Sequence, residues 1–434
     1  MQQHLLKYGG EIIGAVAWDA ITGIASFEFD SKIASLGWDL APIKMPISQQ
    51  NRIFSFPELR AHRNSGFDTF KGLPGLLADI LPDKYGNQLI NVWLAQEGRP
   101  INSMNPVEQL CFIGTRGMGA LEFEPSQFNA SEQAFKIEID SLVNNAQKML
   151  SKREGFGTDF REDERKAVME ILKIGTSAGG ARPKAVIAYN KKTGAVKSGQ
   201  AKAPKDFEHW LIKLDGVSDA QFGESKGYGR VEMAYYLMAK DCGIEMMESQ
   251  LFEENDRVHF MIKRFDREGN ETKHHIQTLC AMQHFDFNQV TSYSYEQLFQ
   301  TMRMLRLPYP QAEQMFRRMV FNVLAKNCDD HTKNFAFQLK KNQQWEIAPA
   351  YDVCHAYRPD SVWVSQHALS INGKRTNITK ADLLTVAKSM NIKKADKIIV
   401  EISQKIASWD IYADMVNVKL ELKNVIKETL IKMH

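Results

Sequence analysis

The sequence predicts an α+β protein with two lobes and an additional α/β subdomain at its amino terminus. Its length of 434 residues is too great for one compact core. Short β-type runs separated by turn signals dominate the first hundred residues, whereas the chain becomes mainly helical from about residue 290 onward. We expect the amino-terminal subdomain at residues 1–130, a mixed α/β lobe at 131–268 and a mainly helical lobe at 269–434.

The composition is that of an ordinary soluble protein, with 44% hydrophobic and 25% charged residues. A net charge of +3 argues against wholesale coating of nucleic acid or of an anionic membrane, and leaves room for a local basic patch. The amino terminus lacks the basic region of a signal peptide, and no segment approaches the roughly 18 apolar residues that span a bilayer. Five scattered cysteines without a C-x-x-C pair favour a reducing compartment, so we expect a cytoplasmic protein without membrane association.

The first elements are short strands followed by a helix. EIIGAVAWD and IASFEFD have strand composition, and LPDKYGNQLINVWLAQEG has helical spacing. Pro82 and Asp83 suit the first turn of this helix, and Gly98 follows as a stop. We expect a compact mixed subdomain.

The middle of the chain begins with a glycine-rich stretch, GTSAGGARPKAV, at residues 175–186. KAVIAY and HWLIKLD then predict adjacent strands, GRVEMAYYLMAKDCG predicts a helix and VHFMIKRFD predicts a further strand. A glycine loop, a strand, a strand with an inward lysine, a helix and a strand follow one another in the small lobe of a kinase. The order of elements therefore predicts a protein-kinase-like fold.

The glycine-rich stretch is not a Walker A motif. Gly175 and Gly180 have the spacing of that motif, but Ala181 and Arg182 stand where it requires a lysine and a hydroxyl residue. The stretch is therefore either an ordinary polar turn or a different phosphate-binding loop whose lysine lies elsewhere.

Lys213 and Glu232 form a candidate pair. Lys213 lies in the predicted strand HWLIKLD with apolar neighbours, and Glu232 follows on the next predicted helix. An ammonium group that binds phosphates and a glutamate that orients it would suit phosphoryl transfer. Taken singly, Lys213 is better explained as an unrelated edge lysine, and Glu232 as a solvated helical glutamate.

The segment NCDDHTKNFAF, residues 327–337, follows a predicted helix with a continuous apolar face. The spacing of Asp329 and Asn334 is that between the base aspartate and the magnesium-binding asparagine of the kinase catalytic loop. Asp352 in IAPAYDVC could complete a magnesium site, because Mg²⁺ prefers hard oxygen ligands and retains several waters.

Two other interpretations of this segment remain open at this point. One is a transition-metal site of a hydrolase; it would use Asp329, Asp330, His331, Asp352 and His355. The other is a capped loop whose polar groups bond to one another. Neither gives a role to the glycine-rich stretch or to the lysine–glutamate pair, so the ordered set favours a kinase.

At these residues the sequence resembles the HipA family of bacterial toxin kinases. The resemblance rests on GTSAGGARPKAVIAY, HWLIKLD, VEMAYYLMAKDCGI, MIKRFDR, NCDDHTKNFAF and APAYDVC, in the order of the family. GLPGLLADILPDKYGN and MNPVEQLCFIGTRGMGALEFEP resemble the family's amino-terminal subdomain, and INGKRTNITKADLLTVA resembles its carboxy-terminal helical region. Nearly the whole chain is covered.

The resemblance implies ATP- and magnesium-dependent phosphorylation of a protein serine or threonine. Asp329 would be the catalytic base, Asn334 and Asp352 would hold Mg²⁺, and Lys263 to Phe265 would form the hinge against the adenine. The residues implied to bind ATP are Ala178, Gly179, Gly180, Ala181, Arg182, Pro183, Lys184, Lys213, Glu232, Lys263, Arg264, Phe265, His331 and Lys333.

Ser177 matches the serine that family members autophosphorylate; without the family it would be an ordinary turn serine. A phosphate there adds about −1.5 to −2 charges beside the expected ATP phosphates, so it should repel the loop from the nucleotide. Two residues depart from some family members: Asp330 stands in place of a glycine and Lys263 in place of a glutamate at the hinge. These departures leave the expected catalytic oxygens intact.

The resemblance further implies the toxin of a toxin–antitoxin pair, which phosphorylates a translation component such as an aminoacyl-tRNA synthetase. An alternative is a co-repressor that acts with a small helix-turn-helix antitoxin of the HipB type and reaches operator DNA through it, because the sequence shows no helix-turn-helix module of its own. A third possibility is a small-molecule kinase, which would share the magnesium ligands but place the phosphate on a metabolite.

Overall fold

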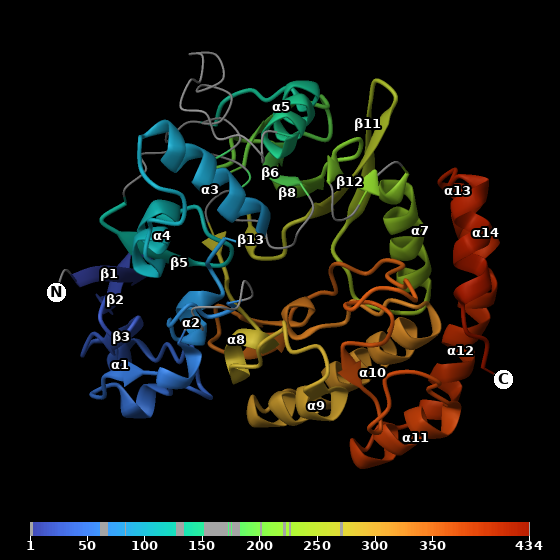
Figure 1. Ribbon diagram of the computed structural model, residues 1–434. Coiled ribbons are helices and arrows are strands. Elements are labelled where there is room, and N and C mark those ends of the chain that lie inside the picture. Colours follow the sequence, from blue (N-terminus) through green and yellow to red (C-terminus); the bar gives the residue numbers. More distant parts are fainter. Residues whose placement is uncertain are drawn as a thin grey trace.

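The computed structural model describes residues 3–60, 68–82, 84–126, 134–151, 172, 175, 183–199, 202–219, 223–224, 227–269 and 272–433. It confirms the predicted α+β class: a mixed α/β lobe and a mainly helical lobe lie beside an amino-terminal subdomain (Figure 1). The expected boundaries between these parts remain predictions.

The amino-terminal subdomain is built on an antiparallel sheet with the strand order β4-β3-β2-β1-β5. Its strands are β1 (Gln3–Tyr8), β2 (Glu11–Asp19), β3 (Ile24–Phe29), β4 (Phe54–Ser55) and β5 (Leu121–Glu124). Its described α-helices are α1 (Ile33–Leu36), α2 (Gly75–Ala78), α3 (Lys84–Gln96) and α4 (Pro106–Ile113), and short 3-10 helices lie at Ile47–Gln49 and Pro57–Leu59. Helix α3 thus begins after Pro82, while Asp83 lies outside the described residues.

The small lobe contains the sheet β11-β12-β8-β6-β7. Its strands are β6 (Lys184–Tyr189), β7 (Val196–Ser198), β8 (Glu208–Lys213), β11 (Ser249–Glu254) and β12 (Arg257–Lys263). Helix α5 (Ile139–Ser151) covers one face, where Val143 and Ala146 join the core of Trp210 and Ile212. Helix α7 (Tyr228–Asp241) contacts β11 and β12, so KAVIAY, HWLIKLD, the helix and VHFMIK form the elements predicted for them.

Short strands and hairpins connect the larger elements. They are β9 (Ser218–Asp219), β10 (Gly223–Glu224), β13 (Arg267–Glu268), β14 (Thr272–Lys273) and the parallel pair β16 (Tyr293–Ser294) and β19 (Leu369–Ser370). A further antiparallel sheet joins β15 (His275–Thr278), β17 (Ala336–Leu339) and β18 (Trp345–Ile347).

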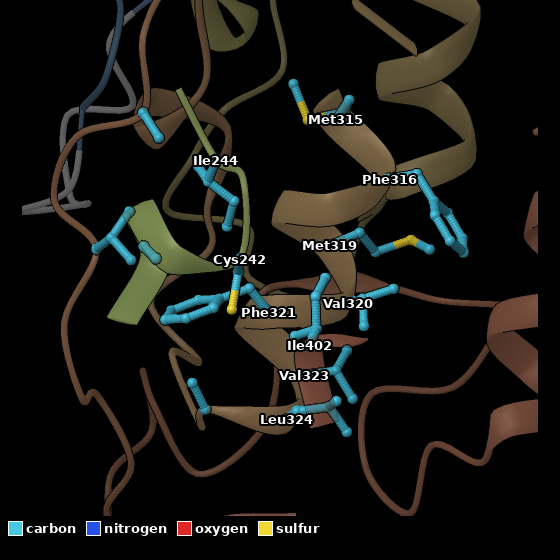
Figure 2. Close-up of a cluster of buried hydrophobic side chains, with 14 of the residues drawn as sticks. Cys242, Ile244, Met315, Phe316, Met319, Val320, Phe321, Val323, Leu324 and Ile402 are labelled. Carbon is cyan, nitrogen blue, oxygen red and sulfur yellow. The ribbon is translucent and has the colours of Figure 1, made fainter. Parts of the chain in front are cut away.

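The large lobe is organised around α10 (Tyr309–Leu324). Met315, Phe316, Met319, Val323 and Leu324 of this helix are almost fully buried, and Figure 2 shows them packed with Cys242, Ile244 and Ile402 from other elements. The other described α-helices of this lobe are α8 (Leu279–Gln283), α9 (Tyr295–Met304), α11 (Lys380–Ser389), α12 (Ala395–Ala407), α13 (Trp409–Met415) and α14 (Leu420–Thr429), and a 3-10 helix spans Thr332–Asn334. The apolar face of α10 anchors the loop that follows it. Among the described helices, none combines the length and apolarity needed to cross a bilayer.

Candidate active site

The ammonium group of Lys213 lies between two carboxylates. Its Nζ is 2.5 Å from Oε1 of Glu232 on α7 and 2.5 Å from Oδ1 of Asp352, which follows β18. Burial alone would lower the pKa of Lys213, but the charges of Asp352 and Glu232 outweigh it and raise the pKa above its ordinary value. The structure therefore joins a strand lysine, a helix glutamate and a loop aspartate that lie far apart in the sequence.

Asp352 is held as a carboxylate by neighbouring cations. Burial would raise its pKa, but Lys213 and then Lys184 lower it to about 2. Lys184 on β6 stands directly opposite Lys213 in the antiparallel register, so both side chains lie on the same face of the sheet. Asp352 also has a φ of 52°, a left-handed conformation that is uncommon for a residue other than glycine and is often found at functional sites.

Asp329 and Asn334 lie on the loop after α10. Asn334 donates from Nδ2 to the backbone oxygen of Asp329 at 2.7 Å, which leaves its amide oxygen as the atom suited to a cation. Nε2 of His331 is 3.7 Å from Oδ1 of Asp329. Burial raises the pKa of Asp329, and the nearby charges of Asp352 and Asp330 add to the rise, whereas His331 and Lys213 oppose it.

Asp330 has a different environment from Asp329. It is buried, accepts from the hydroxyl of Tyr295 at 2.8 Å and from the backbone nitrogen of Ala368 at 2.7 Å, and lies 2.9 Å from Nδ1 of His367. These contacts attach the loop after α10 to the segment that leads into β19. Asp330 therefore holds the loop in place.

The transition-metal interpretation does not agree with these positions. Asp330 bonds to Tyr295, His367 and Ala368, and Nε2 of His355 is 2.9 Å from Oγ1 of Thr429. Within the described ranges, no group of three or more histidine, cysteine, aspartate or glutamate side chains could hold a metal ion in common. The side chains that this interpretation requires therefore do not gather around a common metal position.

The buried His367–Asp330 pair predicts a pH-dependent contribution to stability. Burial lowers the pKa of His367, but Asp330 outweighs it and raises the pKa to about 10. The contribution should be complete below an ordinary histidine pKa of about 6.5 and lost as pH rises through about 10. We expect His367→Gln to reduce the free energy of unfolding by about 3 kcal/mol near neutral pH, because it leaves a buried carboxylate without its cation.

Urea unfolding at several pH values would measure this effect. The difference between the parent and His367→Gln should shrink toward pH 10. The matched control is His275→Gln, since burial lowers the pKa of His275 to about 4 and that group titrates only on the acid side. A pH-independent difference between the parent and His367→Gln would contradict the assignment of a charged pair.

The residues predicted to form the hinge, Lys263 to Phe265, lie at the end of β12, but their side chains do not all face Lys213. The ammonium of Lys263 is 2.5 Å from Oε1 of Glu208 and pairs across the sheet with Trp210, on the face that packs against α5. Arg264 is buried and bonds to Asp266. The ring of Phe265 stacks on Tyr351 with the centroids 5.7 Å apart, next to Asp352.

Other predicted site residues occupy the edges of this region. Pro183 accepts from the backbone nitrogen of Leu214 at 3.1 Å, just after Lys213. The ammonium of Lys333 lies 4.8 Å from the centroid of the Phe287 ring, and its backbone oxygen accepts from the hydroxyl of Tyr351 at 2.7 Å. Ser177, Ala178, Gly179, Gly180, Ala181 and Arg182 lie outside the described residues.

His367 and Tyr295, which hold the loop after α10 in place through Asp330, were not identified from the sequence. His367 lies 37 positions after Asp330, and Tyr295 lies 35 positions before it. Neither stands in a motif, so no local signal connects them with the loop.

Comparisons with known proteins agree with this architecture. The family described as HipA N-terminal domain matches residues 6–124, and the family described as HipA-like C-terminal domain matches residues 176–409. A search of curated proteins gave no match.

Among solved structures, the chain is similar to HipA in the Shewanella oneidensis MR-1 toxin–antitoxin complex of HipA, HipB and operator DNA. The TM-score is 0.66 and the identity 18%, over 98% of this chain and 96% of that one. The Helicobacter pylori proinflammatory kinase CtkA matches with a TM-score of 0.33 and 14% identity, over 58% of this chain and 92% of that one. Because the C-terminal family match alone spans more than half of the chain, the protein belongs to the HipA family.

Proposed function

We propose that the protein is an ATP- and magnesium-dependent serine/threonine protein kinase that acts as the toxin of a toxin–antitoxin pair. The observation that supports this most strongly is the position of Lys213 between Glu232 and Asp352, at 2.5 Å from each. A kinase requires a lysine for the ATP phosphates, a glutamate that orients the lysine and an aspartate that binds the metal. Membership of the family supports the same activity.

The residues present fit a magnesium ion. Asp352 is ionised at neutral pH, because its pKa is about 2, and Asn334 presents an amide oxygen since its nitrogen is engaged by Asp329. These are hard oxygen donors of the kind that Mg²⁺ binds together with phosphates and water. When bound, the ion would neutralise the negative charge on the phosphates.

Asp329 would act as the base for the attacking hydroxyl. The surrounding protein partly desolvates its carboxyl group, which raises the pKa, but 48% of the side-chain surface remains exposed, so a substrate hydroxyl can reach it. Its raised pKa makes the carboxylate a better proton acceptor than an ordinary aspartate. Lys213 and Lys184, which pair on the same face of the sheet, would stabilise the phosphate charge.

The proposed partners follow from the family and from the Shewanella complex. A HipB-like helix-turn-helix antitoxin would bind this chain and would connect it indirectly to operator DNA. The proposed target is a translation component such as an aminoacyl-tRNA synthetase. A phosphate on a hydroxyl in the ATP-binding loop of such an enzyme would disable it by charge repulsion.

Identifying the molecule that receives the γ-phosphate of ATP tests this proposal. The protein would be incubated with magnesium and γ-labelled ATP in cell extract, and the label in acid-precipitated protein compared with the label in small molecules other than ATP and inorganic phosphate. We expect label on serine or threonine of a protein. Label confined to a metabolite would support a small-molecule kinase instead, and no transfer at all would support a co-repressor without kinase activity.

Ser177 would be the autophosphorylated residue. Substituting Ser177→Asp should weaken ATP binding, because a negative charge near the phosphates repels the nucleotide. Ser177→Asn is the matched control, since it has nearly the same size without the charge. The affinity of each variant for ATP can be measured by titration calorimetry; equal affinity in Ser177→Asp and the parent would show that this serine is not an electrostatic switch.

A further inference from the structure

A loop of the amino-terminal subdomain bonds directly to the segment that connects the two lobes. This loop, residues 114–120, joins α4 to β5. The backbone nitrogen of Gly119 donates to Oδ2 of Asp266 at 2.7 Å. Arg267 donates to the backbone oxygen of Gly119 at 2.8 Å and to that of Gly117 at 3.2 Å. The two segments are thus connected by bonds in both directions.

The hairpin formed by β13 and β14 extends the same contact. Nζ of Lys273 donates to the backbone oxygen of Thr115 at 2.9 Å and to Oε1 of Glu122 at 2.7 Å. Lys273 pairs with Arg267 across the hairpin. The hairpin therefore carries its basic side chains to the loop from two adjacent strands.

Asp266 is the centre of this contact and is completely buried. Its oxygens accept from Nε of Arg264 at 2.9 Å and from Nη2 at 2.6 Å, and from Nη1 of Arg267 at 2.7 Å. Burial would raise the pKa of Asp266, but Arg264 and Arg267 hold it well below its ordinary range. A buried carboxylate with these four donor atoms resists displacement, because the loss of one donor would leave negative charge in the interior without compensation.

The hinge on the other side of Asp266 leads to the candidate nucleotide site. The backbone nitrogen of Arg264 donates to the oxygen of His209 on β8, the strand of Lys213, at 2.9 Å. Phe265 accepts at its backbone oxygen from Gln338 of the large lobe at 3.1 Å, and its ring stacks on Tyr351. A shift of Asp266 would therefore move groups that contact both lobes.

Gly119 permits the close approach of the loop. Its φ is 78°, and a Cβ there would lie 3.1 Å from Cγ1 of Ile276. A side chain at this position would strain the backbone and press against β15 at the same time. The loop thus contacts β15, at the start of the large lobe, as well as the hinge segment.

We infer that the 114–120 loop positions the interlobe hinge for nucleotide binding, with Asp266 as the positioning residue. The inference rests on the proposed nucleotide site between the lobes. It assigns the amino-terminal subdomain a direct role in kinase function: displacement of this loop, for example by a partner that binds the subdomain, would weaken nucleotide binding at the hinge.

A pair of glycine substitutions tests this inference. Gly119→Ala displaces the loop, whereas Gly98→Ala places the same side chain at a φ of 70° in the same subdomain, where nothing lies within 4 Å of the added Cβ. Both variants carry similar backbone strain, but only the side chain added at Gly119 presses against a neighbouring strand, at a residue whose backbone bonds to Asp266 and Arg267. The probe is trinitrophenyl-ATP, whose fluorescence reports binding to the full-length protein.

We expect Gly119→Ala to raise the Kd for this nucleotide about five-fold or more, and Gly98→Ala to leave it unchanged. In hydrogen exchange, the amides of Lys263 and Arg264, which bond to Glu248 and His209, should exchange faster in Gly119→Ala only. Arg267→Lys serves as a second variant if Gly119→Ala does not fold, because it keeps the charge beside Asp266 but loses the forked contact to the loop. It should shift both measurements in the same direction.

Several outcomes would overturn the inference. Unchanged affinity and hinge exchange in Gly119→Ala, or in Arg267→Lys where it replaces that variant, would show that the loop does not position the hinge. Equal weakening in Gly119→Ala and Gly98→Ala would show a general loss of stability. If the parent binds nucleotide and Gly119→Ala or Arg267→Lys binds it equally well, the inference fails but the proposed function stands. If the parent binds no nucleotide, the proposed site and the inference fail together.

Discussion

Replacement of Lys213 by methionine is expected to weaken Mg-ATP binding by about tenfold or more and to destabilise the fold. Methionine keeps most of the side-chain volume but leaves Glu232 and Asp352 as two facing carboxylates without their shared cation. Breaking a buried pair typically costs about 3 to 5 kcal/mol; because Asp352 is one-third exposed, we expect about 1 to 3 kcal/mol here. Loss of the ammonium group that would bind the ATP phosphates accounts for the weaker binding of Mg-ATP.

The pH dependence of unfolding distinguishes this from a general packing defect. In the parent the pKa of Asp352 is lowered to about 2, so its contribution to stability is present above its ordinary pKa of 3.8 and is lost as pH falls toward about 2. Lys213→Met should lose less stability over that acid range than the parent. Lys240→Met, an exposed lysine on the same helix as Glu232, is the control. Parent-like nucleotide affinity in Lys213→Met would contradict the role assigned to Lys213.

Asp329→Asn should lower the rate of phosphoryl transfer by about 10² to 10⁴, the usual contribution of a general base. Asparagine has nearly the same shape but cannot accept the proton of the attacking hydroxyl. The pKa of Asp329 is raised, chiefly by burial, so in the parent the base form is lost as pH falls through a value above that of an ordinary aspartate. A pH–rate profile should show this acid limb in the parent.

The same pH–rate profile can also contradict the assignment of Asp329 as the base. If the residual rate of Asp329→Asn fell along the parent's acid limb, another group would be the titrating base. An acid limb at or below the range of an ordinary aspartate would contradict the raised pKa.

Local periodicity was sufficient to predict the elements of the small lobe. KAVIAY and HWLIKLD have the composition of adjacent strands, and they pair in full antiparallel register from Lys184↔Lys213 to Tyr189↔Glu208. Glu232 comes from a helix whose spacing and glycine stop could be read directly. The pairing of Glu232 with Lys213 could be predicted from the order of elements in a kinase-like lobe, and the structure has the same order of elements.

The orientation of Lys263 was harder to anticipate. On β12, Phe260 pairs with Lys213 and Lys263 pairs with Trp210, so Lys213 and Lys263 lie on opposite faces of the sheet. The strand could be recognised from composition, but its register against β8 depends on tertiary pairing. That Lys263 to Phe265 form a hinge against the adenine stays a prediction.

Contacts between distant segments could not be predicted from one sequence. Asp330 looks like a second acidic ligand in the motif, yet it bonds to His367 and to the backbone of Ala368. Asp266 lies 147 positions from Gly119, and neither residue is unusual in its local context. Such pairs depend on how separately folded elements pack against one another.

The most direct test of the proposed active site measures nucleotide binding and phosphoryl transfer on the same samples of three proteins: the parent, Asp329→Asn and Asp360→Asn. Asp360 is exposed on the segment between Asp352 and His367 and serves as the matched control. We predict that all three bind Mg-ATP with similar affinity, and that only the parent and Asp360→Asn transfer the γ-phosphate to protein. Failure of the parent to transfer phosphate, or equal transfer by Asp329→Asn, would contradict the account.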